Sequence, residues 1–168
     1  MLTIIQAETP EQIQRFRELV DEYKAWDIET SGKMGIDVEA LLEFGYADGP
    51  DELVAEFGLP NGRLLLASVD GQVVGCAAMR RLSPQIGEIK RVYVRPAFRG
   101  RGLGRALIET VIAAARLIGY RRLRLETASF MKDAQALYLS LGFHLTDPYR
   151  EIPDELKPLW VFMELKLE

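Results

Sequence analysis

Residues 91–107 combine residue types and spacing that suit the binding of an anion. A strand-like stretch runs into a turn and then directly into a helix with a periodic apolar face. Glycines let the backbone approach a ligand closely, and the first N–H groups of a helix have no intrahelical partner. The helix dipole and nearby guanidinium groups add positive charge at the same point. The turn supplies both residue types: Gly100, Gly102, Gly104, Arg99, Arg101 and Arg105.

Two common phosphate-binding motifs do not fit this turn. A dinucleotide-binding fingerprint requires glycine at position 105 or a small residue at position 107, where the chain has Arg105 and Leu107. A P-loop that begins at Gly100 requires Gly-Lys at positions 105 and 106, where the chain has Arg-Ala. The pattern that remains is Arg99-x-x-Gly102-x-Gly104.

The elements around the turn follow from apolar periodicity. Residues 103–118 are predicted to form a helix, with Gly119 as its C-terminal glycine. Before it, strands are expected at 63–69, 72–81 and 88–94, the first two joined by the hairpin signal Asp70-Gly71. After it, we expect a strand at 121–127, a helix that ends at Gly142, and strands at 143–146 and 159–167.

The N-terminal third is predicted to be mainly helical. After a strand at residues 2–5, Thr9 and Gln12 form a capping box for a helix over 10–24. A second helix is expected around 38–44, broken at Gly49-Pro50, and a short third piece ends at Gly58. The resulting order, β-α-α-β-β-β-α-β-α-β-β, predicts one mixed α/β domain over residues 1–168.

Length and composition exclude several classes of protein. The 168 residues are 48% hydrophobic and 27% charged, as in a globular domain that buries a core. There is no run of about 18 apolar residues and no secretory signal pattern. The single cysteine, Cys76, and the single histidine, His144, argue against a disulfide framework and a structural metal. We therefore expect a soluble, cytoplasmic protein without a metal or a membrane segment.

Charge is segregated along the chain. Residues 80–124 carry 12 basic and 2 acidic side chains, although the net charge is −4. A basic block in an acidic protein favours a local anion site, with a solvated basic face as the alternative. The acidic remainder argues against nucleic acid as a partner.

The turn and a second motif resemble the GNAT superfamily of N-acetyltransferases. Its signature, [Gln/Arg]-x-x-Gly-x-[Gly/Ala] between a strand and a helix, is matched at residues 99–104. A later helix of the type Ala-x-x-Leu-Tyr-x-x-x-Gly-Phe is matched by Ala134, Leu137, Tyr138, Gly142 and Phe143. The resemblance implies a mixed, mostly antiparallel sheet flanked by helices, and an enzyme that transfers an acetyl group from acetyl-coenzyme A to a primary amine by direct attack in a ternary complex.

The resemblance also implies which residues bind the cofactor. The turn would bind the pyrophosphate, and the strand before it would splay from its neighbour so that its backbone bonds the pantetheine arm. The Val92 N–H would face the thioester oxygen; the alternative is an ordinary central strand with a full hydrogen-bond ladder. The implied cofactor-binding residues are Val92, Tyr93, Val94, Arg99, Gly100, Arg101, Gly102, Leu103, Gly104 and Arg105.

Two side chains are candidates for proton transfer. Glu88 matches a position where several enzymes of the family place a general base, which an amine of pKa about 10.4 requires near neutral pH. The alternative is that Glu88 pairs with a member of the basic block, and Glu126 is a weaker competitor. Tyr138 matches the tyrosine that protonates the coenzyme A thiolate, and its alternative is a core residue. Where the family often has an asparagine cofactor contact, this chain has Met131, with Ser129 and Lys132 as candidate substitutes.

The acceptor is less constrained. Acidic residues of the N-terminal helices favour a cationic amine, with a solvated face as the alternative. Residues 146–153 would close over the acceptor, with Tyr149 and Arg150 as contacts. Trp26, Tyr46 and Trp160 could also line the acceptor site, although packing in the core or at its rim is the favoured alternative for each. The last strand is apolar on both faces, which fits a homodimer interface or the middle of a sheet. A different class of function, a catalytically inactive acyl-coenzyme A sensor or partner module, also fits the motifs.

Overall fold

The N-terminal part of the chain is a strand followed by three helices. A computed structural model describes residues 1–45 and 52–167, and the predicted break at Gly49-Pro50 lies outside them. Strand β1 spans Leu2–Gln6, and the helices are α1 (Pro10–Lys33), α2 (Val38–Gly45) and α3 (Glu52–Phe57). The predicted order had two helices here, so the short third piece is an additional helix. The capping box of Thr9 and Gln12 is present at the start of α1.

Helix α1 is longer than predicted. The sequence indicated an end at residue 24, but the helix continues to Lys33 and Gly35 follows with a φ of 78°. The apolar stripe fades after Tyr23 because the last turns bury polar side chains, Asp27 and Ser31, which hydrogen-bond to each other at 3.1 Å. A polar buried pair gives no apolar periodicity, so the pattern understated the length.

The middle of the chain forms an antiparallel set of strands. These are β2 (Arg63–Val69), β3 (Gln72–Ser83) and β4 (Ile86–Val94). Asp70 and Gly71 both have positive φ values, 49° and 82°, as the predicted two-residue hairpin requires. A short 3₁₀ turn at Pro96–Phe98 then leads to α4 (Leu103–Ile118), whose bounds and C-terminal Gly119 are as predicted.

The C-terminal part completes the sheet. It contains β5 (Arg122–Ala128), α5 (Lys132–Ser140), β6 (His144–Thr146), a 3₁₀ turn at Lys157–Leu159, and β7 (Trp160–Lys166). The seven strands have the order β1-β2-β3-β4-β5-β7-β6, and only the β4–β5 pair is parallel. The fold is therefore mixed α/β with a mostly antiparallel sheet, as predicted. Strand β7 lies inside the sheet, which accounts for its two apolar faces.

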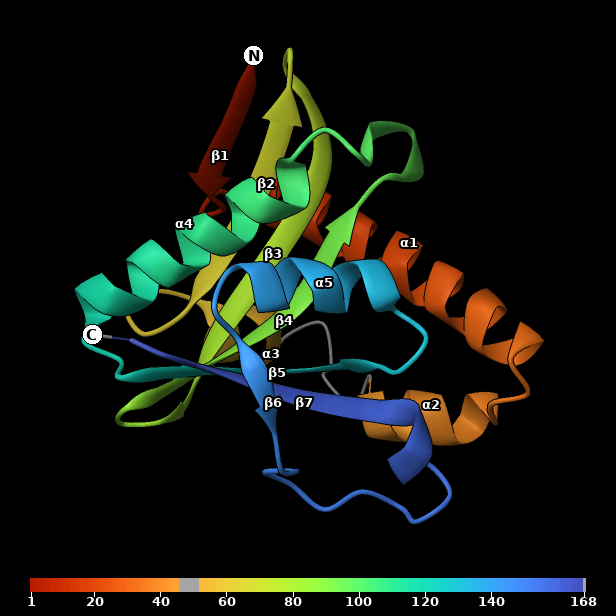
Figure 1. The fold of residues 1–168 in the computed structure, drawn as a ribbon. Helices are drawn as coiled ribbons and strands as arrows, with labels where there is room; N and C mark the ends of the chain where they lie inside the picture. The colour runs from red at the N-terminus through yellow and green to blue at the C-terminus, as the bar shows by residue number, and fades with distance from the viewer. Residues whose placement is uncertain (46–51, 168) are drawn as a thin grey trace.

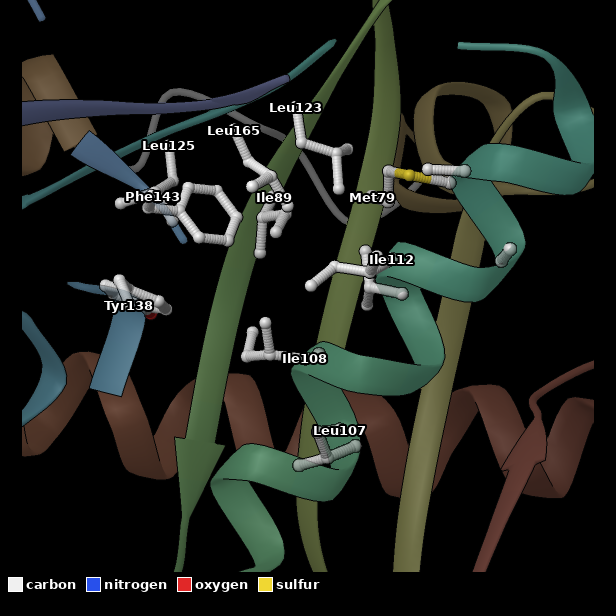
Figure 2. Close-up of a cluster of buried hydrophobic side chains, with 14 of the residues drawn as sticks. Met79, Ile89, Leu107, Ile108, Ile112, Leu123, Leu125, Tyr138, Phe143 and Leu165 are labelled. Carbon is white, nitrogen blue, oxygen red and sulfur yellow. The ribbon is translucent and has the colours of Figure 1, made fainter. Parts of the chain in front are cut away.

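Helices cover both faces of this sheet (Figure 1). Helices α4 and α5 lie on the face toward the viewer, and α1 lies behind it. The cluster on the first face joins α4, α5 and the sheet, and Figure 2 shows Ile108 and Ile112 of α4 beside Met79 and Ile89. A second cluster packs α1 and α3 against the other face through Phe16, Leu19 and Phe57. The sheet is thus held between two apolar layers, and its strands position whatever lies at their ends.

Candidate active site

The site begins where β4 and β5 separate. The two strands pair only from Ile86 with Arg122 to Ile89 with Leu125. Beyond that point β4 pairs with β3 alone, and β5 pairs with β7 alone. The alternative of a full ladder along β4 is therefore wrong, and the edge of residues 90–94 that faces β5 has no strand partner in the described part of the chain.

A bulge in β4 accompanies the separation. Cys76 of β3 lies opposite Tyr93 and Ala78 lies opposite Lys90, so β4 contains an extra residue at this point. Arg91 has a φ of 57°, an uncommon value for a residue with a side chain. Its carbonyl accepts a hydrogen bond from the Cys76 thiol at 3.3 Å. Bulges bend the strand that carries them, so the geometry of Arg91 turns the end of β4 away from β5.

The turn that follows β4 presents free backbone donors. None of the N–H groups of residues 100–105 donates a hydrogen bond within the described part of the chain. Gly100 and Gly102 have φ values of 77° and 81°, and a Cβ atom on either would meet open space. The N–H groups at the start of α4 therefore border an open cradle with the positive end of the helix dipole, as an anion requires.

The three arginines of the turn point in different directions. The Arg99 guanidinium lies over the rings of Trp26 and Tyr93, at 5.3 and 5.7 Å, and donates to the Val94 carbonyl at 2.9 Å. Arg101 lies over the ring of Phe98. Arg105 donates to the Ser140 hydroxyl at 2.6 Å and so connects α4 to α5. Arg99 is thus partly occupied by aromatic packing, while all three keep the turn positively charged.

Glu88 is buried and has two partners. Only 2% of it is exposed, and its Oε1 accepts from Arg80 Nε at 2.8 Å. Its Oε2 accepts from the Tyr149 hydroxyl at 2.7 Å. Arg80 also bonds Glu56 of α3 at 2.6 Å, and these two carboxylates raise the pKa of Arg80 against the opposing effect of burial. The carboxylate therefore does pair with the basic block, through Arg80.

Tyr138 lies on the α5 side of the separation. It is buried against Phe143, with ring centroids 5.7 Å apart, and burial raises the pKa of Tyr138 to about 12. Figure 2 shows it at the edge of the cluster formed by Ile89, Leu125 and Phe143. Burial, Asp27 and the nearby Tyr138 raise the pKa of Tyr23, which belongs to the cluster on the opposite face.

The segment between β6 and β7 reaches the same place. Besides bonding Glu88, Tyr149 packs edge-on against Phe162 at 5.0 Å and lies under the Arg124 guanidinium at 5.3 Å. Burial and the carboxylates of Glu88 and Glu126 raise the pKa of Tyr149, so its phenol stays protonated. Arg150 forms an ion pair with Glu126 at the end of β5. Tyr149 and Arg150 therefore lie beside the two candidate carboxylates.

The other sequence candidates are occupied elsewhere. Of the N-terminal acidic residues, Glu22 pairs with Arg95, Glu29 pairs with Lys33, and Asp27 is buried beside Ser31. Cys76 is buried, burial raises its pKa, and His144 is exposed. Tyr46 lies outside the described residues. Asp21, Asp37 and Glu39 are exposed, so a cationic acceptor near these helices stays a prediction.

Sequence reasoning missed two contributors. Gln135 of α5 donates from its side-chain amide to the carbonyls of Ala128 and Ser129, at 3.0 and 3.1 Å. It thereby holds the end of β5 to α5, where Met131 provides no side-chain cap. Arg80 was counted in the basic block but not linked to Glu88, although their cross-strand register places them opposite each other. That pairing follows only from the length of the turn between β3 and β4.

Two classes of site are not found in the described residues. No group of three or more His, Cys, Asp or Glu side chains could hold a metal ion there. No helix in those ranges is long and apolar enough to cross a membrane.

Comparisons with known proteins place the chain among acetyltransferases. Residues 16–143 match the model of the acetyltransferase (GNAT) family. An uncharacterized N-acetyltransferase of Schizosaccharomyces pombe is 33% identical, over 99% of this chain and 95% of its own length. A crystal structure of a putative acyl-CoA N-acyltransferase from Klebsiella pneumoniae is 29% identical, with a TM-score of 0.73 over 100% of this chain and 99% of that one. A putative acetyltransferase from Salmonella typhimurium, solved with its cofactor acetyl-CoA, shares the fold at 22% identity and a TM-score of 0.69, over 100% of this chain and 95% of that one.

Proposed function

The chain belongs to the GNAT family of acetyltransferases, and we propose that it transfers the acetyl group of acetyl-coenzyme A to a primary amine of a small molecule or peptide. The observation that carries this proposal is the position of the open cradle at residues 100–105 directly beside the unpaired edge of β4. One ligand that has a pyrophosphate at one end and a thioester at the other would occupy both. Acetyl-coenzyme A has this form, and a related fold has been solved with it.

The residues present fit this cofactor. The free N–H groups from Gly100 to Arg105 would hold the pyrophosphate, with charge from Arg101 and Arg105. A Cβ at Gly100 or Gly102 would extend into open space, so these two glycines leave room beside the donors. The exposed backbone of Val92, Tyr93 and Val94 would bond the pantetheine arm, and the Val92 N–H would stabilise the oxygen of the tetrahedral intermediate. Removing a donor of this kind from other enzymes costs roughly 3–4 kcal/mol.

Glu88 is the proposed general base. The amine must lose a proton as its nitrogen bonds the thioester carbon, and a carboxylate near that carbon can accept it directly or through water. Both oxygens of Glu88 already accept one hydrogen bond each, but a carboxylate has about four acceptor positions. Arg80 and Tyr149 thus fix the orientation of the group and leave capacity for the incoming proton.

Tyr138 is the proposed donor to the leaving sulfur. With a pKa of about 12 it remains a phenol at neutral pH. As the C–S bond breaks, the phenol can donate to the thiolate. A free thiol has a pKa of about 8.5, lower than that of this phenol. A hydrogen bond from the Tyr138 phenol therefore stabilises the leaving thiolate more readily than complete proton transfer to it does.

Calorimetric titration with acetyl-coenzyme A tests the binding half of the proposal. We expect micromolar affinity in the wild type and at least tenfold weaker binding in R101A/R105A. No binding at millimolar ligand would refute the cofactor assignment. An analogue without the 3′-phosphate then reports how much affinity the rest of the molecule supplies.

Turnover distinguishes the enzyme from a sensor. Release of free thiol is followed with a panel of amines, including polyamines and basic peptides. Acetylation that is lost in E88Q and Y138F supports the mechanism. Cofactor binding without turnover of any amine, unchanged in both variants, would favour the acyl-coenzyme A sensor instead.

A further inference from the structure

A second cavity lies at the opposite end of the sheet from the cradle. Its volume is about 860 Å³, and it opens where β4 and β5 begin and where α4 and β7 end. Helix α4 has 16 residues, so at 1.5 Å per residue its two ends are roughly 24 Å apart. The cradle is at the first turn of α4 and the cavity is at the last. The two sites are therefore separate.

Four of the ten residues that line this cavity are positively charged. Arg116, Arg121, Arg122 and Lys166 all border it, and no carboxylate does among the described residues. Arg122 shares Glu164 with Arg124, at 3.4 and 2.7 Å. The other three lining cations form no ion pair within residues 1–45 and 52–167. Arg81 stands close by, with its guanidinium over the ring of Tyr120 at 5.8 Å.

Ordinary structural roles do not account for this cluster. Arg116 in the last turn of α4 offsets the negative end of the helix dipole. The helix dipole does not account for Arg121, which directly precedes β5, or for Lys166, which is the last residue of β7. A bound anion would neutralise the positive charge that these residues place around the cavity.

The remaining lining indicates the kind of anion. Guanidinium groups bind phosphate and carboxylate in a forked geometry. The backbone is already committed: the N–H groups of Arg121 and Arg122 both donate to the Gln85 carbonyl. The contacts must therefore come from side chains. Tyr120, Ile86 and Leu167 add apolar surface, and the volume lies within the usual range for small-molecule sites.

We propose that this cavity is a second anion-binding site, which takes a small organic or inorganic anion with at least two phosphate or carboxylate groups. The site does not depend on the acetyl-transfer function. The ligand is a small molecule taken up from solution, and its anionic groups must be spaced so that several of these cations bind them at once.

The experiment must separate this site from the cradle, which also attracts phosphates. All titrations are therefore made in the R101A/R105A background, with pyrophosphate and with citrate as probes, at low ionic strength. The test variant adds R121A/K166A. Both of these side chains are exposed, so their removal leaves the core intact. The matched control adds R15A/K33A, which removes two exposed cations from α1 and changes the net charge equally.

We expect at least one probe to bind the background protein with a dissociation constant of about 1 mM or lower. R121A/K166A should weaken that binding at least tenfold, and R15A/K33A should leave it unchanged within twofold. Amide shifts in nuclear magnetic resonance should appear at residues 119–122 and not at 100–105. A preference between pyrophosphate and citrate identifies the phosphate or the carboxylate as the natural group. The absence of binding at 5 mM for both probes, or equal weakening by both double variants, would overturn the proposal.

Discussion

The substitution Gly102→Ala tests the cradle through two measurable effects, a loss of stability from backbone strain and a loss of affinity for the cofactor. Gly102 has a φ of 81° and stands at the N-terminal cap of α4. A left-handed conformation costs a residue with a Cβ roughly 1–2 kcal/mol, and no atom lies within 4 Å of the added carbon to increase that cost. For a chain of this length the loss corresponds to a fall in Tm of about 2–8 °C.

The effect on binding is larger and has a different origin. Gly102 carries one of the free N–H groups of residues 100–105, and a Cβ on it would extend into the open space next to that group. Displacing the pyrophosphate from one or two of these donors removes hydrogen bonds to a charged group, each worth about 1.5–3 kcal/mol. Calorimetry should therefore show acetyl-coenzyme A binding at least tenfold weaker than in the wild type.

Gly119→Ala is the matched control. Gly119 ends the same helix with a φ of 102°, and a Cβ there also meets open space. The strain, and so the loss of Tm, should be similar, while the affinity for acetyl-coenzyme A should not change. If both variants bind with wild-type affinity, or if both lose it equally, the cradle does not hold the pyrophosphate.

Three further results follow from the same geometry. Tyr138→Phe should lower kcat by about 10²-fold or more with little change in cofactor affinity, and an unchanged kcat in this variant would remove Tyr138 from the mechanism. Because burial raises the pKa of Tyr138 to about 12, the wild-type kcat should show no decline from this group below about pH 11. Glu88→Gln should lower kcat/KM by about 10²-fold, and full activity in this variant would leave Glu88 a structural role only. Tyr149→Phe removes one hydrogen bond to the Glu88 carboxylate, worth about 1.5–3 kcal/mol, and should therefore lower kcat/KM by about 10–150-fold. Stability should fall in alkali, since the folded state keeps the Tyr138 proton that the unfolded chain releases near pH 10, and the loss approaches about 2.7 kcal/mol above pH 12. Buried Cys76 and Tyr23, whose pKa values are also raised, add to the slope; urea midpoints at pH 8 and 10.5 measure it, and equal midpoints would contradict the assigned burial.

Local signals predicted the elements that carry the site. The apolar period of α4, with Gly119 at its end, gave the helix bounds because each choice concerns neighbours within one turn. The Asp70-Gly71 hairpin and the capping box of Thr9 are equally local. The family motifs then placed the cradle at the start of α4.

The side-chain environment of the site was not predictable in the same way. Glu88 meets Tyr149, 61 residues later in the chain, and it meets Arg80 across a strand pair. The bulge at Arg91 occurs in a β-branched stretch that is typical of a regular strand, so no local residue marks it. Such features depend on which elements come together, and tertiary packing decides that.

The basic block shows how far a one-dimensional charge pattern can be interpreted. Its excess of ten positive charges suggested one anion site, but the fold divides it by position along α4. The residues before the helix line the cradle. Arg80 forms hydrogen bonds and ion pairs with Glu88 and Glu56. Three further cations, Arg116, Arg121 and Arg122, border the second cavity. At about 24 Å, these two groups are separated by more than twice the Debye length at physiological salt, about 8 Å, so charge removed from one changes little of the potential at the other. Any coupling between the two sites would therefore pass through packed elements that reach both, which are helix α4 and the strands β4 and β5 that begin at the cavity and separate at the proposed acetyl-transfer site.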